Sequence, residues 1–176
     1  MRNGLKEGVQ TKITLAVRKE TGKIKGDGLD YIVNTLKYIK SKYGFFKKGD
    51  KRITKRTRTA EEIIKSEVMT GCTDYAHLFL ALCRAKKIPA LYVEAFDNDW
   101  LKKPSKSIRG HILVRVDVKG REFVVDPTRG SINVVGSYGK YTPMKEGVDF
   151  LTLFPTREIY ISAICKYFKI KNGVLS

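Results

Sequence analysis

The stretch GCTDYAHLFLALCRAKKIPALYVEAF, residues 71–96, decides how this chain folds. After Gly71 and Cys72, apolar residues recur at helical spacing as far as Cys83, and two lysines then suit a helix C-terminus. Pro89 cannot continue a helix, and the apolar, partly aromatic run after it is typical of a strand. We therefore predict a helix from Cys72 to about Lys86 and a strand over 91–96, with Cys72 in the first turn of the helix.

A β-hairpin is predicted downstream of this unit. The runs His111–Val118 and Arg121–Val125 flank Lys119-Gly120, which suits a tight turn. With that turn centre, cross-strand partners have numbers that sum to about 239. His111 and Asp126 then lie within about two residues of each other across the ladder, which is close enough for their side chains to touch.

The remaining segments complete an α+β pattern, with helices first and an antiparallel sheet after them. Helices are predicted from about Asp27 to Gly44, from a capping box at Thr59 to about Glu67, and from Thr156 to about Lys169, where a strand over Ile159–Ile164 stays open. Residues 1–26 are predicted as an extended arm with a strand at Thr11–Val17, followed by a turn at Thr21–Gly28. A polar loop is predicted over 97–110 and irregular structure over 129–148.

Length and composition favour one soluble domain. The chain has 176 residues, of which 42% are hydrophobic, enough for a core without disulfide bonds. Its three cysteines are too few for a disulfide framework, the N-terminus lacks the apolar core of a signal peptide, and no stretch is long enough to span a membrane. We expect a reduced, cytoplasmic protein that does not bind a membrane.

Positive charge is concentrated in the first third of the chain. Residues 1–60 hold 17 of the 35 Lys and Arg residues but 5 of the 18 Asp and Glu residues, a net charge of +12. The densest run is Lys47–Arg58. It is interpreted either as a solvated loop or as a surface that attracts acidic partners or nucleic acid. Because no aromatic residues alternate with these charges, single-strand nucleic-acid binding has no support from a motif.

Cys72, His111 and Asp126 together supply what thiol catalysis requires: a nucleophile, a base and a group that orients the base. The unpaired N–H groups of a helix N-terminus stabilise a thiolate, and the Cys72 amide is a candidate oxyanion donor. The other cysteines, Cys83 and Cys165, are predicted to lie in or near the core. A zinc site is not expected, because Cys83 lies about 16 Å along the helix from Cys72.

The three segments resemble the transglutaminase-like superfamily of cysteine hydrolases. The resemblance rests on GCTDYAHLFLALCRAKKIPALYVEAF, on GHILVRV and FVVDPTRG, which begin at residues 110 and 123, and on the helix TAEEIIKS before them. Their order agrees, as do their spacings of 39 residues from Cys72 to His111 and 15 from His111 to Asp126. The match covers about residues 28–150, so we divide the chain into an N-terminal arm, 1–26, and a transglutaminase-like catalytic domain, 27–176.

The resemblance implies a papain-like α+β core in which the helix that bears the nucleophile packs on an antiparallel sheet. It implies Cys72 as nucleophile, His111 as general base and then acid, and Asp126 as the orienter of His111. Hydrolysis of an amide through a thioester acyl-enzyme is the leading interpretation, with no cofactor and no metal. A protein-glutamine acyltransferase and a non-catalytic basic binding module are the alternatives. The expected partner is a protein or peptide substrate, and the basic run would suit an acidic one.

Overall fold

The computed structural model describes residues 4–45, 56–171 and 174–175. Its helices are α1 (Leu15–Gly22), α2 (Gly28–Lys42), α3 (Ala60–Ser66), α4 (Cys72–Ala85), α5 (Asn98–Lys102), α6 (Phe150–Leu153) and α7 (Arg157–Phe168). Its strands are β1 (Gly44–Phe45), β2 (Val68–Met69), β3 (Ala90–Asp97), β4 (Gly110–Val118), β5 (Arg121–Asp126), β6 (Ser131–Val134) and β7 (Tyr141–Gly147).

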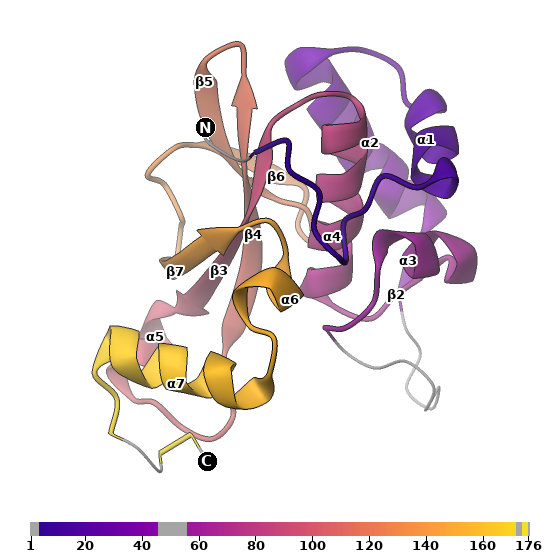
Figure 1. Cartoon of the computed structure of the whole chain (residues 1–176). Helices are drawn as coiled ribbons and strands as arrows, with labels where there is room; N and C mark the ends of the chain where they lie inside the picture. Colours follow the sequence, from indigo (N-terminus) through magenta and orange to yellow (C-terminus); the bar gives the residue numbers. More distant parts are fainter. Residues whose placement is uncertain (1–3, 46–55, 172–173, 176) are drawn as a thin grey trace.

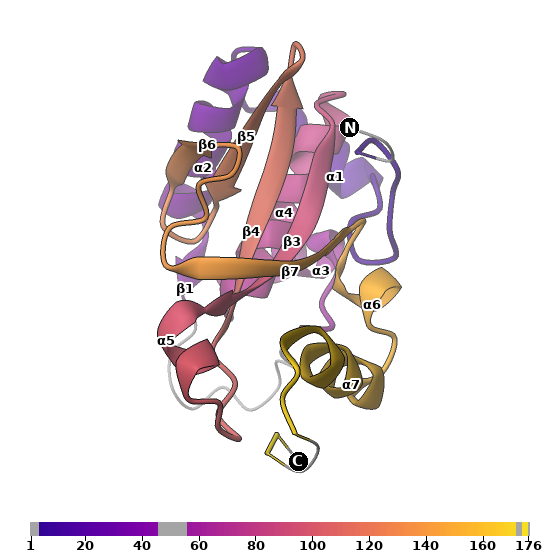
Figure 2. The same ribbon diagram turned by 90° about the vertical axis from the view of Figure 1, so that its left-hand side faces the viewer.

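The fold is α+β, as the sequence predicted. Five strands form one sheet in the order β6-β5-β4-β3-β7, and all neighbouring strands in it are antiparallel. Helices α1 to α4 lie together on one side of this sheet, and α6 and α7 lie beyond β7 at its lower end (Figures 1 and 2). A separate parallel pair, β1 and β2, joins the end of α2 to the segment that leads into α4.

Helix α4 is the centre of the core. Every residue from Thr73 to Arg84 is buried, and the helix packs on β3 and β4 on one side and on the other helices on the other side. Among the largest buried side chains around it are Tyr31, Phe79 and Tyr92. Each such burial is worth about 1.5–3 kcal/mol, so the position of the Cys72 end of the helix is firmly fixed.

The hairpin forms in the predicted register. Val118 pairs with Arg121 and Val114 with Val125, so partner numbers sum to 239 along the β4–β5 ladder. The capping box at Thr59 is also confirmed: its side chain accepts from the Glu62 amide while the Glu62 carboxylate accepts from the Thr59 amide. The helix predicted after Thr156 is α7, and the alternative strand over Ile159–Ile164 is wrong.

The strand predicted at Thr11–Val17 is wrong. The Thr14 side chain accepts a hydrogen bond from the Val17 amide and so caps α1, which is the N-cap role that threonine commonly fills. The alternation of polar and apolar residues in TKITLAV therefore does not come from a strand, although Val17 in this segment is buried. The predicted turn at Thr21–Gly28 begins only after this helix has ended, at Lys23.

Two other segments carry more structure than predicted. The loop 97–110 contains the short helix α5, because the Asp97 carboxylate accepts from the Asp99 and Trp100 amides. The Trp100 side chain is buried and packs on Phe96. The prediction of irregular structure over 129–148 is wrong, because β6 and β7 form there at the two edges of the sheet. Strand β7 contains Pro143, which an edge strand tolerates and which lies opposite a shift in register in β3. Because proline is uncommon in strands, β7 could not be recognised in the sequence.

Residues before α2 pack on the rest of the chain. The buried Arg84 guanidinium donates to the Gly4 carbonyl at 3.3 Å and to the Thr11 hydroxyl at 2.6 Å, and Val17 belongs to the main core. The division between arm and domain at residue 26 stays a prediction. Within the described ranges, none of the helices combines the length and apolar character needed to cross a bilayer.

Candidate active site

Cys72 is the first residue of α4 and its side chain is half-buried. Gly71 before it has an extended backbone and open space where a Cβ would lie. Gly71 is the N-cap residue of α4 and, having no side chain, makes no capping hydrogen bond to the amides of the first turn. Among the hydrogen bonds of the described residues none uses the Cys72 amide, which therefore remains available to an anion beside the sulfur.

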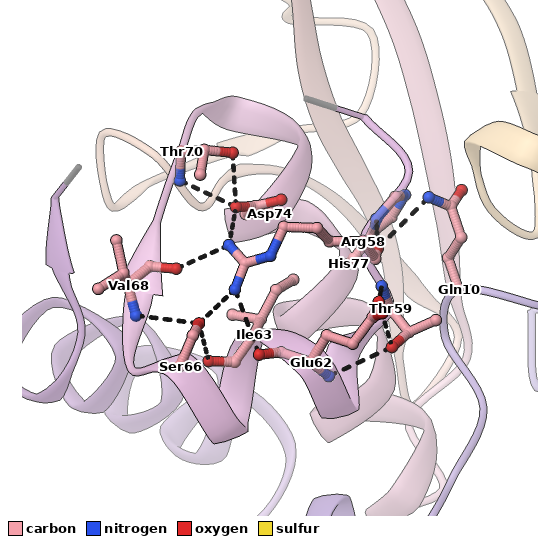
Figure 3. Close-up of polar contacts among 10 residues, drawn as sticks. All are labelled: Gln10, Arg58, Thr59, Glu62, Ile63, Ser66, Val68, Thr70, Asp74 and His77. Carbon is pink, nitrogen blue, oxygen red and sulfur yellow. Dashed lines mark hydrogen bonds and ion pairs between the residues drawn. The ribbon is translucent and has the colours of Figure 1, made fainter. Parts of the chain in front are cut away.

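A buried ion pair holds the chain that leads into Cys72 (Figure 3). Arg58 donates to the Asp74 carboxylate at 2.7 Å and to the Val68 carbonyl at 2.8 Å. The same carboxylate oxygen accepts from both the amide and the hydroxyl of Thr70, each at 2.8 Å. Thr70 lies before Cys72 and Asp74 lies after it, and both are joined at the carboxylate that pairs with Arg58. These contacts fix the position of the thiol between them.

His111 and Asp126 meet at the end of the hairpin. His111 Nε2 lies 2.7 Å from Asp126 Oδ2, and both side chains are nearly buried. A carboxylate accepts only, so Nε2 carries a proton and donates it. In the neutral ring Nδ1 is then the unprotonated nitrogen, the one left for Cys72.

The Asp126 carboxylate is held in place by backbone donors. Its Oδ1 accepts from the Thr128 amide at 3.0 Å and from the Arg129 amide at 3.1 Å. Burial raises the pKa of Asp126, but the hydrogen bond and charge of His111, together with the amide and charge of Arg129, outweigh burial and keep the pKa below its usual value. The carboxylate therefore stays ionised and fixes both the tautomer and the orientation of the imidazole.

Cys72 also acts on the imidazole. Burial lowers the pKa of His111, but hydrogen bonds with Asp126 and with Cys72 raise it, together with their charges, to about 9. The thiol therefore lies close enough to His111 to interact with it directly. The structure brings all three predicted side chains together, and their catalytic roles stay predictions.

Two residues beside His111 were not found from the sequence. The Tyr141 ring stacks on the imidazole, with centroids 4.6 Å apart and planes inclined by 19°. Arg129 donates to the Tyr141 hydroxyl at 2.7 Å and lies 3.7 Å from the Asp126 carboxylate. Arg129 stands in the DPTRG segment, but Tyr141 lies in the stretch predicted to be irregular, so no sequence signal placed it on the imidazole.

The other two cysteines are buried, as predicted, and the second histidine is buried as well. Cys83 and Cys165 are buried, and burial raises the pKa of the Cys83 thiol. His77 is fully buried, with Nδ1 3.1 Å from the Arg58 carbonyl, and burial lowers its pKa to about 4. The two histidines thus shift in opposite directions, and only His111 is a cation near neutral pH.

The two described arginines of the basic run each pair with a buried carboxylate. Arg58 is paired with Asp74, and Arg56 lies 3.2 Å from the buried carboxylate of Glu94. For these two residues the interpretation as a solvated loop is wrong, and their charges are satisfied within the protein. The rest of the run, 47–55, lies outside the described residues.

The comparisons with known proteins agree with the geometry. The model of the transglutaminase-like superfamily matches residues 15–127, a segment that includes all three site residues. No curated protein matches the chain. A solved structure from Cytophaga hutchinsonii, named provisionally as a cysteine protease, is similar with a TM-score of 0.61 and 23% identity. The match covers 83% of this chain and 46% of that one, so this chain spans about half the length of that protein.

Proposed function

This chain belongs to the transglutaminase-like superfamily, and on that premise we propose that it is a thiol-dependent amide hydrolase. The observation that supports the proposal most strongly is the contact of His111 with both Cys72 and Asp126. A nucleophile, a base and an orienter in this order suit acyl transfer through a thioester.

The proposed reaction begins from the ion pair in which the thiol proton already lies on His111, the ring that is a cation near neutral pH. The Cys72 sulfur then attacks the amide carbonyl carbon, and the developing oxyanion accepts from the Cys72 amide N–H. The imidazolium gives its proton to the leaving amine as the C–N bond breaks, which leaves a thioester. Water then attacks the thioester, His111 takes the proton from that water, and the acid leaves as the thiol is restored.

Asp126 is a positioning residue in this scheme. It holds the proton on Nε2 and so leaves Nδ1 to exchange a proton with the sulfur and the amine. Burial of the pair, with side-chain exposures of 11% for His111 and 4% for Asp126, strengthens the interaction by excluding water.

A protein-glutamine acyltransferase would use the same acyl-enzyme and differ only in the acceptor. The test is to incubate the protein with N-acyl amide substrates with and without added primary amine, and to identify the products and the Cys72 adduct by mass spectrometry. We expect an acyl group on Cys72 and mostly the acid product. Predominant transfer to the amine would indicate the acyltransferase. Turnover without any adduct on Cys72 would contradict both.

A further inference from the structure

A cavity of about 460 Å³ opens beside the start of β4. Its walls come from α6, α7 and the loop before β4, and they include Ile108, Phe150, Phe154, Tyr160 and Ile161. Figure 2 shows α6 and α7 beside one another at the lower end of the sheet. The volume and the mainly aromatic and aliphatic lining are typical of pockets that bind small organic groups.

Arg56 connects this pocket with Cys72. Its guanidinium lies 5.2 Å from the Phe150 ring centroid and 5.0 Å from that of Tyr160, so it forms part of the pocket floor. Burial lowers the pKa of Arg56, but Glu94 and, more weakly, Cys72 raise it above its usual value. The thiol is therefore near enough to act on a residue of the pocket.

Gly110 connects the pocket with His111, which follows it in the chain. A Cβ on Gly110 would lie 3.2 Å from Arg56 Nη2, 3.2 Å from Glu94 Oε1 and 3.4 Å from the Tyr160 hydroxyl. The pocket floor thus touches the backbone that carries the imidazole.

The charges of the pocket floor are already satisfied. Glu94 is fully buried, pairs with Arg56 at 3.2 Å, and accepts from Tyr160 at 2.8 Å and from Tyr92 at 2.7 Å. No buried charge is left over to attract an ion. The other cation that lines the pocket, Arg157, is exposed, so solvent would screen its attraction for an anionic group, whereas an apolar group gains from burial.

We propose that this pocket binds an uncharged, apolar side chain of the substrate, next to the amide bond that Cys72 attacks. The inference rests on the proposed function and names its substrate class. The proposed pocket favours substrates with an apolar side chain at this position, whereas the basic run suggested acidic substrates.

The test measures binding and turnover separately. Peptide amides that differ only in Phe, Leu, Gly or Asp at the residue before the scissile bond are titrated calorimetrically into Cys72→Ala protein, and kcat/KM is measured with the intact enzyme. We expect Phe and Leu to bind at least about tenfold more tightly than Asp and to be turned over about 10²-fold faster, as hydrophobic pockets typically allow.

Ile161→Trp fills the pocket, and Ile159→Trp is its matched control because Ile159 is 47% exposed on the same helix. We expect Ile161→Trp to abolish the preference for Phe and leave the Gly peptide unaffected, and Ile159→Trp to behave as the parent protein. Equal binding of the four peptides, or an unchanged preference in Ile161→Trp, would overturn the pocket proposal. Peptides that bind with the expected preference but are not turned over would instead contradict the hydrolase proposal.

Discussion

Replacement of Cys72 by alanine is expected to lower kcat for amide hydrolysis on the order of 10⁶-fold, the scale seen when a hydrolase loses its nucleophile. Without the sulfur no thioester forms, and neither His111 nor the helix N-terminus supplies another nucleophile. The side chain is half-buried at the edge of the core, so the melting temperature should change little. The measurement is release of the amine from a peptide amide, with the melting temperature recorded for the same protein.

The matched control is Cys165→Ala. This cysteine is buried in α7 and makes none of the site contacts described above, so its loss should leave kcat and KM unchanged. Cys72→Ser is expected to be as inactive as Cys72→Ala, because a serine hydroxyl keeps its proton beside an imidazolium. If Cys72→Ala retained the turnover of the parent protein, Cys72 would not be the nucleophile.

Replacement of Arg58 by alanine should destabilise the fold by about 3–5 kcal/mol, the usual cost of leaving one partner of a buried ion pair without the other. The Asp74 side chain is 1% exposed and would be left buried without its cation. For a chain of this size the loss corresponds to a fall in melting temperature of about 10 °C. Because the ion pair holds the segment before Cys72, kcat should also fall. Thermal melting and amide turnover are the two measurements.

Lys65→Ala is the control for this effect. Lys65 pairs with Glu61 at 2.8 Å on α3, but its side chain is 70% exposed, so its loss should not shift the melting temperature. Arg58→Lys should rescue Arg58→Ala only in part, because a single ammonium cannot reproduce the fork whose Nη1 reaches Asp74 and the Val68 carbonyl and whose Nη2 reaches the Glu62 carbonyl. A melting temperature for Arg58→Ala equal to that of the parent protein would show that the ion pair does not hold the fold.

Local signals predicted the elements that build the site. The capping box at Thr59, the apolar spacing after Cys72 and the turn at Lys119-Gly120 each depend on neighbouring residues, and all three elements formed as predicted. The hairpin register placed His111 near Asp126 because cross-strand pairing follows directly from the turn centre. These features can be recognised without knowing what packs on them.

Other features depend on contacts between distant parts of the chain. Tyr141 stacks on His111 only because β7 pairs with β3 at the far edge of the sheet. Arg56 and Arg58 were predicted as members of a charged run, but their partners, Glu94 and Asp74, lie 38 and 16 residues away. Charge density in a sequence window cannot distinguish a solvated cation from one that a buried carboxylate neutralises.

Alkylation of Cys72 by iodoacetamide across pH, read at each cysteine by mass spectrometry, tests the central claim most directly. His111 has a pKa of about 9 and so stays protonated through neutral pH, which places a positive charge beside the sulfur. We predict that Cys72 reacts fast well below pH 7, while the buried Cys83 and Cys165 do not. In His111→Ala this fast reaction should vanish and return only as the pH approaches about 8.5, as for an ordinary thiol. Identical pH profiles of Cys72 in the two proteins would contradict a catalytic pair of Cys72 and His111.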